Sequence, residues 1–76
     1  MIQSENLVKG QKLKVNLNSV RDRLPKNIIK QLTINPIGKL VGYKMVDGNN
    51  FGLVLELSNG SKSWFFEHEL LEAAEN

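Results

Sequence analysis

The stretch LVLELSNGSKSWFFEHELL, residues 53–71, contains the strongest indication of the fold in this chain. Within it, Asn59-Gly60 is the dipeptide most typical of a two-residue β-hairpin turn, which requires a positive φ at both residues. That turn makes Ser58 face Ser61 and fixes the register of both strands. The predicted pairs, from the turn outward, are Leu57 with Lys62, Glu56 with Ser63, Leu55 with Trp64, Val54 with Phe65 and Leu53 with Phe66.

The predicted register assigns the apolar residues of the hairpin to two faces, because side chains alternate along a strand. Val54 and Phe65 share one face, and a fully solvated surface needs no such aliphatic–aromatic pair. Either the N-terminal segment or a helix covers this pair, or the pair is an exposed contact patch of the kind found at protein-binding hot spots. The other face is expected to be core, and it carries Leu53, Leu55, Leu57, Trp64 and Phe66.

The composition excludes most catalytic chemistry. A chain of 76 residues makes one small domain with one modest core. It contains no cysteine, so it has no thiol chemistry, no disulfide and no cysteine-ligated metal. Its single histidine, His68, has no partner set for a metal site or a catalytic triad, and its glycines are scattered at turns. We therefore expect no enzyme, no metal and no cofactor.

The distribution of charge is uneven along the chain. Nine basic and two acidic residues precede Met45, whereas one basic and six acidic residues follow it. This asymmetry is either ordinary solvated charge or an electrostatically steered docking surface. The sequence has no run of about 20 apolar residues, the length of a membrane span. We expect a cytosolic protein, or one that is peripheral to a membrane.

The remaining secondary structure follows from apolar periodicity and from proline and glycine positions. Residues 12–18 alternate as a half-buried strand, and Leu24, Ile28 and Leu32 form the apolar stripe of a short helix that Asn35-Pro36 ends. Residues 37–46 read as a long strand in which Gly38 and Gly42 indicate a bend or bulge. A last helical turn is expected over residues 67–74.

This inventory predicts a mostly β protein. We expect a small SH3-like barrel, with one short helix inserted after the first strand and a helical turn near the C-terminus. A split α+β sheet is the alternative. The expected organisation is a flexible N-terminus at residues 1–8, a single domain over residues 9–74 and a frayed end at residues 75–76.

A basic edge is the second candidate surface. Arg23, Lys26 and Lys30 recur at helical spacing on a face other than the apolar stripe, and Arg21 lies close to them in sequence. The guanidinium forks of the arginines suit carboxylates or phosphates on a partner. In the alternative interpretation, Asp22 satisfies backbone groups in the turn and the arginines are simply solvated.

Several short motifs, in this order, resemble the PetP family of small regulatory subunits associated with the cyanobacterial cytochrome b6f complex. The resemblance covers residues 8 to about 71, and its most specific parts are the RDR segment and the WFFE-x-EL ending. The motifs are Val8-x-Gly10-Gln11-Lys12-x-Lys14-Val15, Arg21-Asp22-Arg23, the helix from Ile28 to Leu32, Ile37-Gly38, Tyr43-Lys44, Val46-Asp47-Gly48, Gly52 and Trp64-Phe65-Phe66-Glu67-x-Glu69-Leu70.

The resemblance implies an SH3-like fold, which is also similar to the variable chain of ferredoxin:thioredoxin reductase and to the ferredoxin-docking subunit S of the photosynthetic NDH complex. It further implies a peripheral, non-catalytic subunit on the cytoplasmic side of the thylakoid that regulates photosynthetic electron transport. The expected partner is the cytochrome b6f complex or another electron-transfer protein, with membrane association only through that partner. The expected partner-binding residues are Arg21, Arg23, Lys26, Lys30, Val54 and Phe65.

Two other functions remain open. Small barrels with a sequence pI near 9 often bind nucleic acid, but sites for single strands interleave exposed aromatic and basic residues. Here acidic residues follow the aromatic cluster, so we expect no nucleic acid. The other alternative is a subunit of a different electron-transfer complex that docks acidic ferredoxin on its basic edge.

Overall fold

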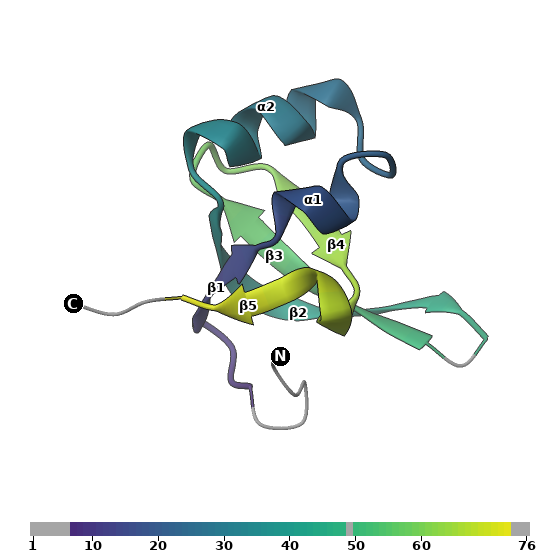
Figure 1. Ribbon diagram of the computed structural model, residues 1–76. Coiled ribbons are helices and arrows are strands. Elements are labelled where there is room, and N and C mark those ends of the chain that lie inside the picture. Colours follow the sequence, from purple (N-terminus) through teal and green to yellow (C-terminus); the bar gives the residue numbers. More distant parts are fainter. Residues whose placement is uncertain (1–6, 49, 74–76) are drawn as a thin grey trace.

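Five strands form one antiparallel sheet in the part of the chain that the structure, a computed structural model, describes, namely residues 7–48 and 50–73. Within these residues, two helices and one 3-10 turn connect the strands, and Figure 1 shows both helices on the same side of the sheet. Along the chain the elements are β1 (Lys12–Val15), α1 (Leu17–Val20), α2 (Lys26–Ile34), β2 (Ile37–Asp47), β3 (Asn50–Leu57), β4 (Lys62–Phe65), the 3-10 turn η2 (Glu67–Glu69) and β5 (Leu70–Glu72).

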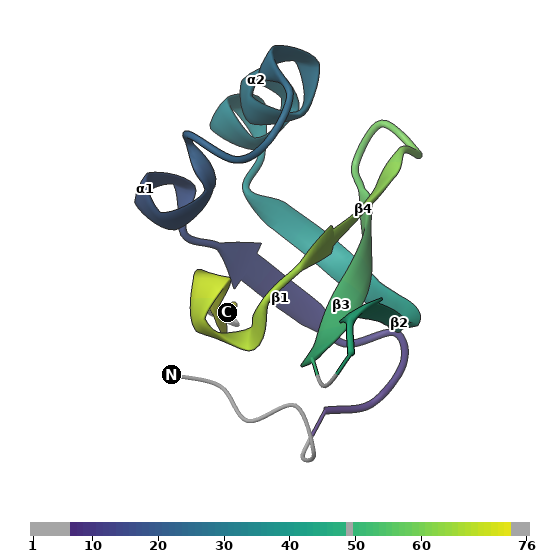
Figure 2. The ribbon, with the colours of Figure 1, turned by 90° about the vertical axis from the view of Figure 1, so that its right-hand side faces the viewer.

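The strand order is β4-β3-β2-β1-β5, so the two outermost strands, β4 and β5, are consecutive in the sequence. Because only η2 joins them, the sheet has to curve and bring its two ends toward each other, as Figure 2 shows. A strongly curved antiparallel sheet of five short strands is typical of a small barrel. The predicted fold class, mostly β and SH3-like, is confirmed.

The core lies on the concave side of the sheet and is closed by the helices. In β1 the predicted alternation is confirmed, since Leu13 and Val15 are buried whereas Lys12 and Lys14 are exposed. The buried apolar residues of the described chain are Leu13, Val15, Val20, Leu32, Leu40, Leu53, Leu55, Leu57, Phe65 and Leu70.

The first strand ends earlier than predicted and is followed by an additional helix. β1 stops at Val15 because the Asn16 side chain accepts a hydrogen bond from the backbone N–H of Asn18 at 3.2 Å, which is the N-cap that begins α1. Val20 of this helix is buried in the core. The sequence pattern could not indicate α1, because one helical turn is too short to show a period.

The predicted helix is confirmed as α2. It begins after Pro25, whose carbonyl accepts a hydrogen bond from the N–H of Ile28 at 3.1 Å, and it ends before Asn35. Leu32 is buried, while Leu24 and Ile28 pack against the core. The apolar stripe therefore faces the sheet, as its spacing predicts.

Glycine occupies two positions of β2 for different structural reasons. A Cβ at Gly38 would lie 2.9 Å from the Leu55 Cβ, so the two strands approach too closely for a side chain at this position. Gly42 lies at a β-bulge, where the register against β3 shifts after Leu40, and a Cβ at Gly42 would meet nothing within 4 Å. The predicted irregularity of this strand is confirmed at Gly42.

The C-terminal part of the domain contains a strand that was not predicted. The helical turn expected over residues 67–74 is limited to η2, and Ala74 lies outside the described residues. A three-residue strand is too short to show alternation in the sequence. β5 pairs with β1 through Leu13 with Glu72, Lys14 with Leu71 and Val15 with Leu70.

The turn of the β3–β4 hairpin is a three-residue loop, 58–60, and the predicted two-residue turn is wrong. Gly60 has a φ of +88°, but no described residue other than glycine has a positive φ, so Asn59 does not take the conformation that the predicted turn requires. The Gly60 N–H donates to the Leu57 carbonyl at 2.9 Å, and the Leu57 N–H donates to the Ser61 carbonyl at 2.7 Å. A loop of this length with a left-handed glycine is the next most common hairpin connection.

The longer loop moves β4 by one residue and turns each of its side chains to the other face. Phe65, which was expected beside Val54 on an outer patch, lies opposite Leu53 and is fully buried. Trp64 and Phe66, which were expected in the core, are only half-buried. The predicted contact patch of Val54 and Phe65 is therefore wrong, and so is the core position of Trp64 and Phe66.

The predicted limits of the domain fall partly on residues 1–6 and 74–76, which lie outside the described chain. Among the described residues near the N-terminus, Leu7 packs against the core and the Val8 N–H donates to the Gln11 side chain at 3.3 Å. The division into a flexible start at 1–8, a domain at 9–74 and a frayed end at 75–76 stays a prediction.

The register predicts unequal effects of two neighbouring aromatic substitutions. Phe65→Ala should lower the free energy of unfolding by about 3–5 kcal/mol, because it removes a fully buried ring from the core. Trp64→Ala should cost about 1–2 kcal/mol, and Phe51→Ala, at an exposed ring, within about 0.5 kcal/mol. Denaturant unfolding of the three variants measures this. A larger loss at Trp64 than at Phe65 would contradict the register.

The glycines of β2 give a matched pair of substitutions. Gly38→Ala should destabilise the domain by about 1–3 kcal/mol, because the added Cβ is forced against the Leu55 side chain. Gly42→Ala, on the same strand but in open space, should change the free energy of unfolding by less than about 0.5 kcal/mol. Thermal and denaturant unfolding test both. Equal stability of the two variants would exclude a close approach at Gly38.

Candidate functional site

A bidentate ion pair joins the connection between α1 and α2 to η2. Arg23 Nε donates to Glu69 Oε2 at 2.9 Å, and Arg23 Nη2 donates to Glu69 Oε1 at 2.6 Å. The same Nη2 also donates to the Trp64 carbonyl at 3.3 Å, and Glu69 Oε1 accepts from the Phe66 N–H at 2.8 Å. One guanidinium thus contacts both the end of β4 and the 3-10 turn.

The pair is a structural feature of the domain. The Glu69 side chain is only 3% exposed, and a buried carboxylate is costly unless it is paired and hydrogen-bonded. Arg23, at 27% exposure, supplies the opposite charge. The expectation that Arg23 belongs to an open basic edge is therefore corrected, because its fork is already occupied by Glu69. A long-range pair of this kind leaves no local signal in the sequence.

An aromatic cluster surrounds Arg23 at the surface. The guanidinium lies 4.4 Å from the centroid of the Trp64 ring and 5.5 Å from that of Phe66, within the range of cation–π attraction. Trp64 and Phe66 meet edge to face at 5.0 Å, and Phe66 stacks on His68 at 5.7 Å. The cluster forms because the register of β4 places Trp64 outside the core, where its ring meets Arg23 and Phe66.

The other predicted basic residues are exposed to solvent and form the basic edge. Arg21, Lys26 and Lys30 are all exposed, the first in the connection before α2 and the other two on the helix itself. Val54 is half-buried and Phe65 is fully buried. Of the predicted partner-binding residues, only these three basic side chains are fully open to a partner.

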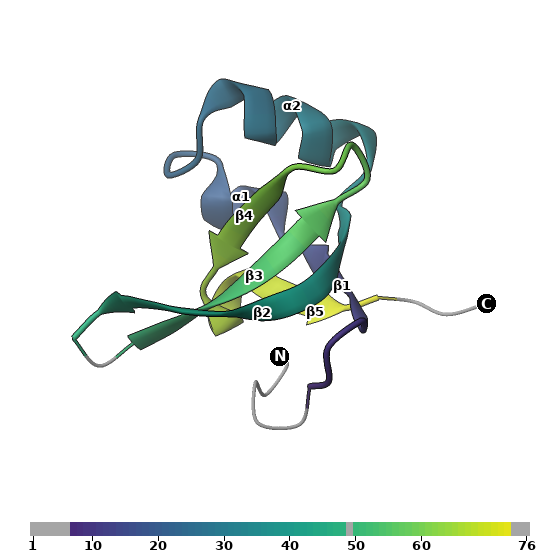
Figure 3. The same ribbon diagram turned by 180° about the vertical axis from the view of Figure 1, so that it is seen from behind.

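The far end of the β2–β3 hairpin projects from the body as an arm, seen in Figures 1 and 3. We define the arm by Tyr43–Met45 and Phe51–Leu53. Met45 pairs with Phe51 and Tyr43 pairs with the buried Leu53, so the face of the sheet that is core in the body continues along the arm. Tyr43, Met45 and Phe51 are 46%, 54% and 58% exposed on it. The glycines of β2 prevented the sequence from indicating this face.

The described residues hold no group of three or more side chains of the types His, Cys, Asp or Glu that could bind a metal ion. Among the same residues, no helix combines the length and the hydropathy that crossing a membrane would require.

The fold and the exposed surfaces define this chain as a small SH3-like domain that presents an apolar arm and basic surfaces to its surroundings. The chain belongs to the family described as "Cytochrome b6f, subunit Tsr0524-like", whose model matches residues 9–71. Its structure is similar to the solution structure of the cyanobacterial cytochrome b6f complex subunit PetP, with a TM-score of 0.70 and 28% sequence identity over 97% of this chain and 91% of that one. A search of curated proteins found no match. The resemblance drawn from the sequence motifs is confirmed.

The ion pair of Arg23 and Glu69 predicts strong coupling between the two residues. Arg23→Met should lower the free energy of unfolding by about 3–5 kcal/mol, because it leaves the Glu69 carboxylate buried without a partner. The double variant Arg23→Met/Glu69→Met should recover much of that loss. Lys39→Met, which breaks an exposed pair with Glu56 at 3.7 Å, is the control and should cost less than about 1 kcal/mol. If the losses of unfolding free energy from the two single substitutions add up in the double variant, the two residues are not coupled and the pairing is contradicted.

Proposed function

We propose that this chain is a non-catalytic subunit that binds the cytochrome b6f complex from outside and regulates photosynthetic electron transport. The observation that supports this most directly is the family match over residues 9–71, together with the similarity to PetP along nearly the whole chain. The proposed place is the cytoplasmic side of the thylakoid membrane. The regulatory effect follows from occupancy of a surface of the complex rather than from chemistry in the chain.

The arm is the part of the domain best suited to contact the complex. Exposed apolar side chains that are contiguous on one face mark interaction sites in soluble proteins. Met45 and Phe51 are direct cross-strand neighbours, and Tyr43 is the next position on the same face of β2. Aromatic residues and methionine are enriched in the cores of protein interfaces. A projecting hairpin can reach a recess on a large complex that the body of the domain cannot enter.

The basic edge has a different role in this proposal. Arg21, Lys26 and Lys30 are exposed, so each contributes little binding energy, but together they attract an acidic surface over a distance comparable to the Debye length. We therefore assign the lifetime of the contact to the apolar arm and the rate of encounter to the basic edge.

The binding experiment compares the pair of exposed apolar residues on the arm with one exposed apolar residue elsewhere. Met45→Ser/Phe51→Ser should weaken binding to detergent-solubilised cytochrome b6f complex at least about tenfold, mostly through faster dissociation, because it removes the central apolar contact. Ile34→Ser, at a residue 71% exposed at the end of α2, is the matched control and should bind as the unchanged protein does. Surface-immobilised chain and a titration of complex give both rate constants.

Two results would contradict these proposals, one the role of the arm and the other the proposed function. Unchanged binding of the Met45→Ser/Phe51→Ser variant would exclude the arm as the contact while leaving the family role intact. Absence of binding by the unchanged protein, in a preparation that retains its native fold, would overturn the proposed function itself.

Charge reversal of the basic edge tests the second role. The triple variant Arg21→Glu/Lys26→Glu/Lys30→Glu should associate more slowly with the complex, with little change in dissociation, and its association rate should depend less on salt. The rates are measured at about 0.05 M and about 0.3 M salt, where screening differs strongly. A change confined to dissociation would place these residues inside the contact instead.

A further inference from the structure

A row of charged side chains crosses the outer face of the sheet. Lys12 of β1 pairs with Lys39 of β2, Lys39 pairs with Glu56 of β3, and Glu56 pairs with Lys62 of β4. Because direct cross-strand partners share a face, these side chains stand side by side on the convex surface. Glu56 is bonded to Lys39, whose Nζ lies 3.7 Å from Glu56 Oε1. The row therefore presents three cations for one carboxylate.

The arrangement is unfavourable for the isolated domain. Lys12 and Lys39 are placed directly opposite each other, and like charges at such positions destabilise a sheet. Neither the fold nor the core requires lysine at these outward positions, since the side chains are exposed. Glu56 offsets part of this repulsion through its ion pair with Lys39, and an anion bound beside Lys12 and Lys39 would offset more of it.

Two further lysines lie at outward positions of the same sheet. Lys14 follows Lys12 on the same face of β1, and Lys44 lies outward on the arm opposite Gly52. At the outward positions of β1 to β4, Glu56 is the only acid whose side chain the structure describes. We call the lysine face the surface formed by Lys12, Lys14, Lys39, Lys44 and Lys62.

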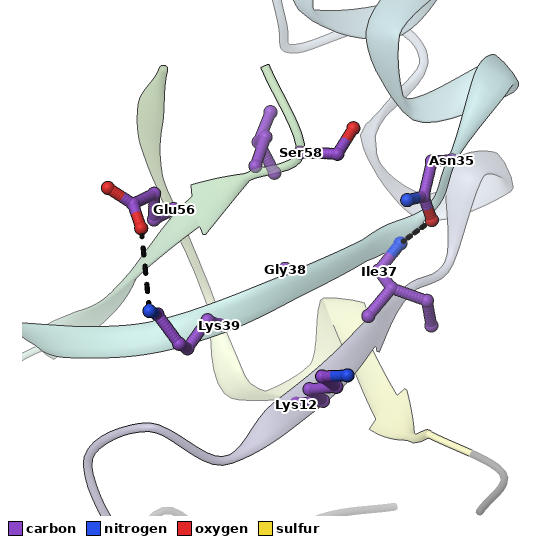
Figure 4. A pocket seen from close by; sticks show the side chains of 8 residues that line it. Lys12, Asn35, Ile37, Gly38, Lys39, Glu56 and Ser58 are labelled. Carbon is purple, nitrogen blue, oxygen red and sulfur yellow. Dashed lines mark hydrogen bonds and ion pairs between the residues drawn. The ribbon is translucent and has the colours of Figure 1, made fainter. Parts of the chain in front are cut away.

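Two recesses lie along the lysine face. Figure 4 shows the first, a groove of about 320 Å³ lined by Lys12, by the ion pair of Lys39 with Glu56, and by Asn35 and Ser58 toward the end of α2. The second, of about 460 Å³, is lined by Lys14 together with Arg21 and other residues. Both are shallow and have mixed polar and apolar linings, and each has at least one lysine where a small anionic group would enter. Such volumes are at the lower end of the range of small-ligand sites, which is roughly 300–1,000 Å³.

The composition of this face favours a lipid surface over other anionic partners. Its cations are lysines, which are compact, strongly hydrated point charges without the fork that binds a carboxylate in two places. Its outward aromatic residue, Trp64, is half-buried and stacked against Arg23, so it is not open for base stacking or for insertion into a partner. A broad field of lysines matches an array of separate headgroup charges, which needs no fixed geometry.

We propose that the lysine face binds an anionic lipid bilayer directly, with phosphate or sulfonate headgroups entering the groove between Lys12 and Lys39. This inference goes beyond the proposed function, because it gives the chain a membrane affinity of its own. It also departs from the expectation that the chain reaches a membrane only through its protein partner.

The test is co-sedimentation of the purified chain with lipid vesicles, in the absence of any cytochrome complex. Vesicles contain phosphatidylcholine alone or with about one-third phosphatidylglycerol, an anionic lipid, at low and at high salt. We expect binding to the anionic vesicles only, and loss of that binding at high salt. No binding to anionic vesicles at low salt would overturn the proposal.

Matched variants separate the lysine face from net charge. Lys12→Gln/Lys39→Gln should reduce the vesicle partition coefficient about tenfold or more. Lys26→Gln/Lys30→Gln removes the same charge from exposed positions on α2 and should reduce it much less. Equal losses in the two variants would overturn the assignment to this face. Thermal unfolding confirms that both variants are folded.

Two further measurements distinguish lipid binding from nucleic-acid binding and from binding of the cytochrome b6f complex. Binding of a mixed oligonucleotide that Lys12→Gln/Lys39→Gln abolishes, with no binding to vesicles, would assign the face to nucleic acid instead. The same variant should still bind solubilised cytochrome b6f complex, so that failure of the lipid site and failure of the proposed function give different results.

Discussion

The left-handed conformation of Gly60 decides which side of β4 faces the core. Because this residue alone supplies the positive φ, the hairpin closes with three residues rather than two, and the strand is displaced by one position. Phe65 then fills the core, and Trp64 lies at the surface within reach of Arg23. The position of the guanidinium between Trp64 and Glu69 depends on this displacement.

The Arg23–Glu69 pair explains how a long connection between β1 and β2 is held on a small sheet. The connection contains both helices, and the closure of a long loop is entropically costly unless contacts offset it. Arg23 provides such contacts in the middle of this connection. It bonds both to the end of β4 and to η2. The aromatic rings around it exclude water from one side of the pair and thereby strengthen the interaction.

Sequence reasoning predicted those features of the fold that repeat along the chain. The alternation of Leu53, Leu55 and Leu57 and the stripe of α2 extend over two or more periods, so their burial could be predicted. α1 and β5 are too short to show a period. The side on which β4 buries its aromatic residues depends on the turn at Asn59-Gly60, where Gly60 has a positive φ and Asn59 does not. The partner of Arg23 is 46 residues away, and no local pattern indicates it. For the same reason the candidate surfaces could be predicted only as a basic edge, and the arm and the lysine face emerged from strand pairing.

The acidic residues of the second half of the chain determine which basic residues remain open. Glu69 neutralises Arg23 in the interior, and Glu56 pairs with one lysine of the sheet, while the other lysines of β1 to β4 have no ion pair within the described chain. Besides the basic edge of Arg21, Lys26 and Lys30, a second cationic surface therefore lies on the convex face, separate from the apolar side of the arm. Two weak contacts on one rigid domain reinforce each other only where the geometry lets both form at once, since binding at one then raises the effective concentration at the other. For a domain that binds a membrane-embedded complex and the lipid beside it, the angle between the arm and the lysine face would fix its orientation. A change in either contact would then alter the occupancy of both.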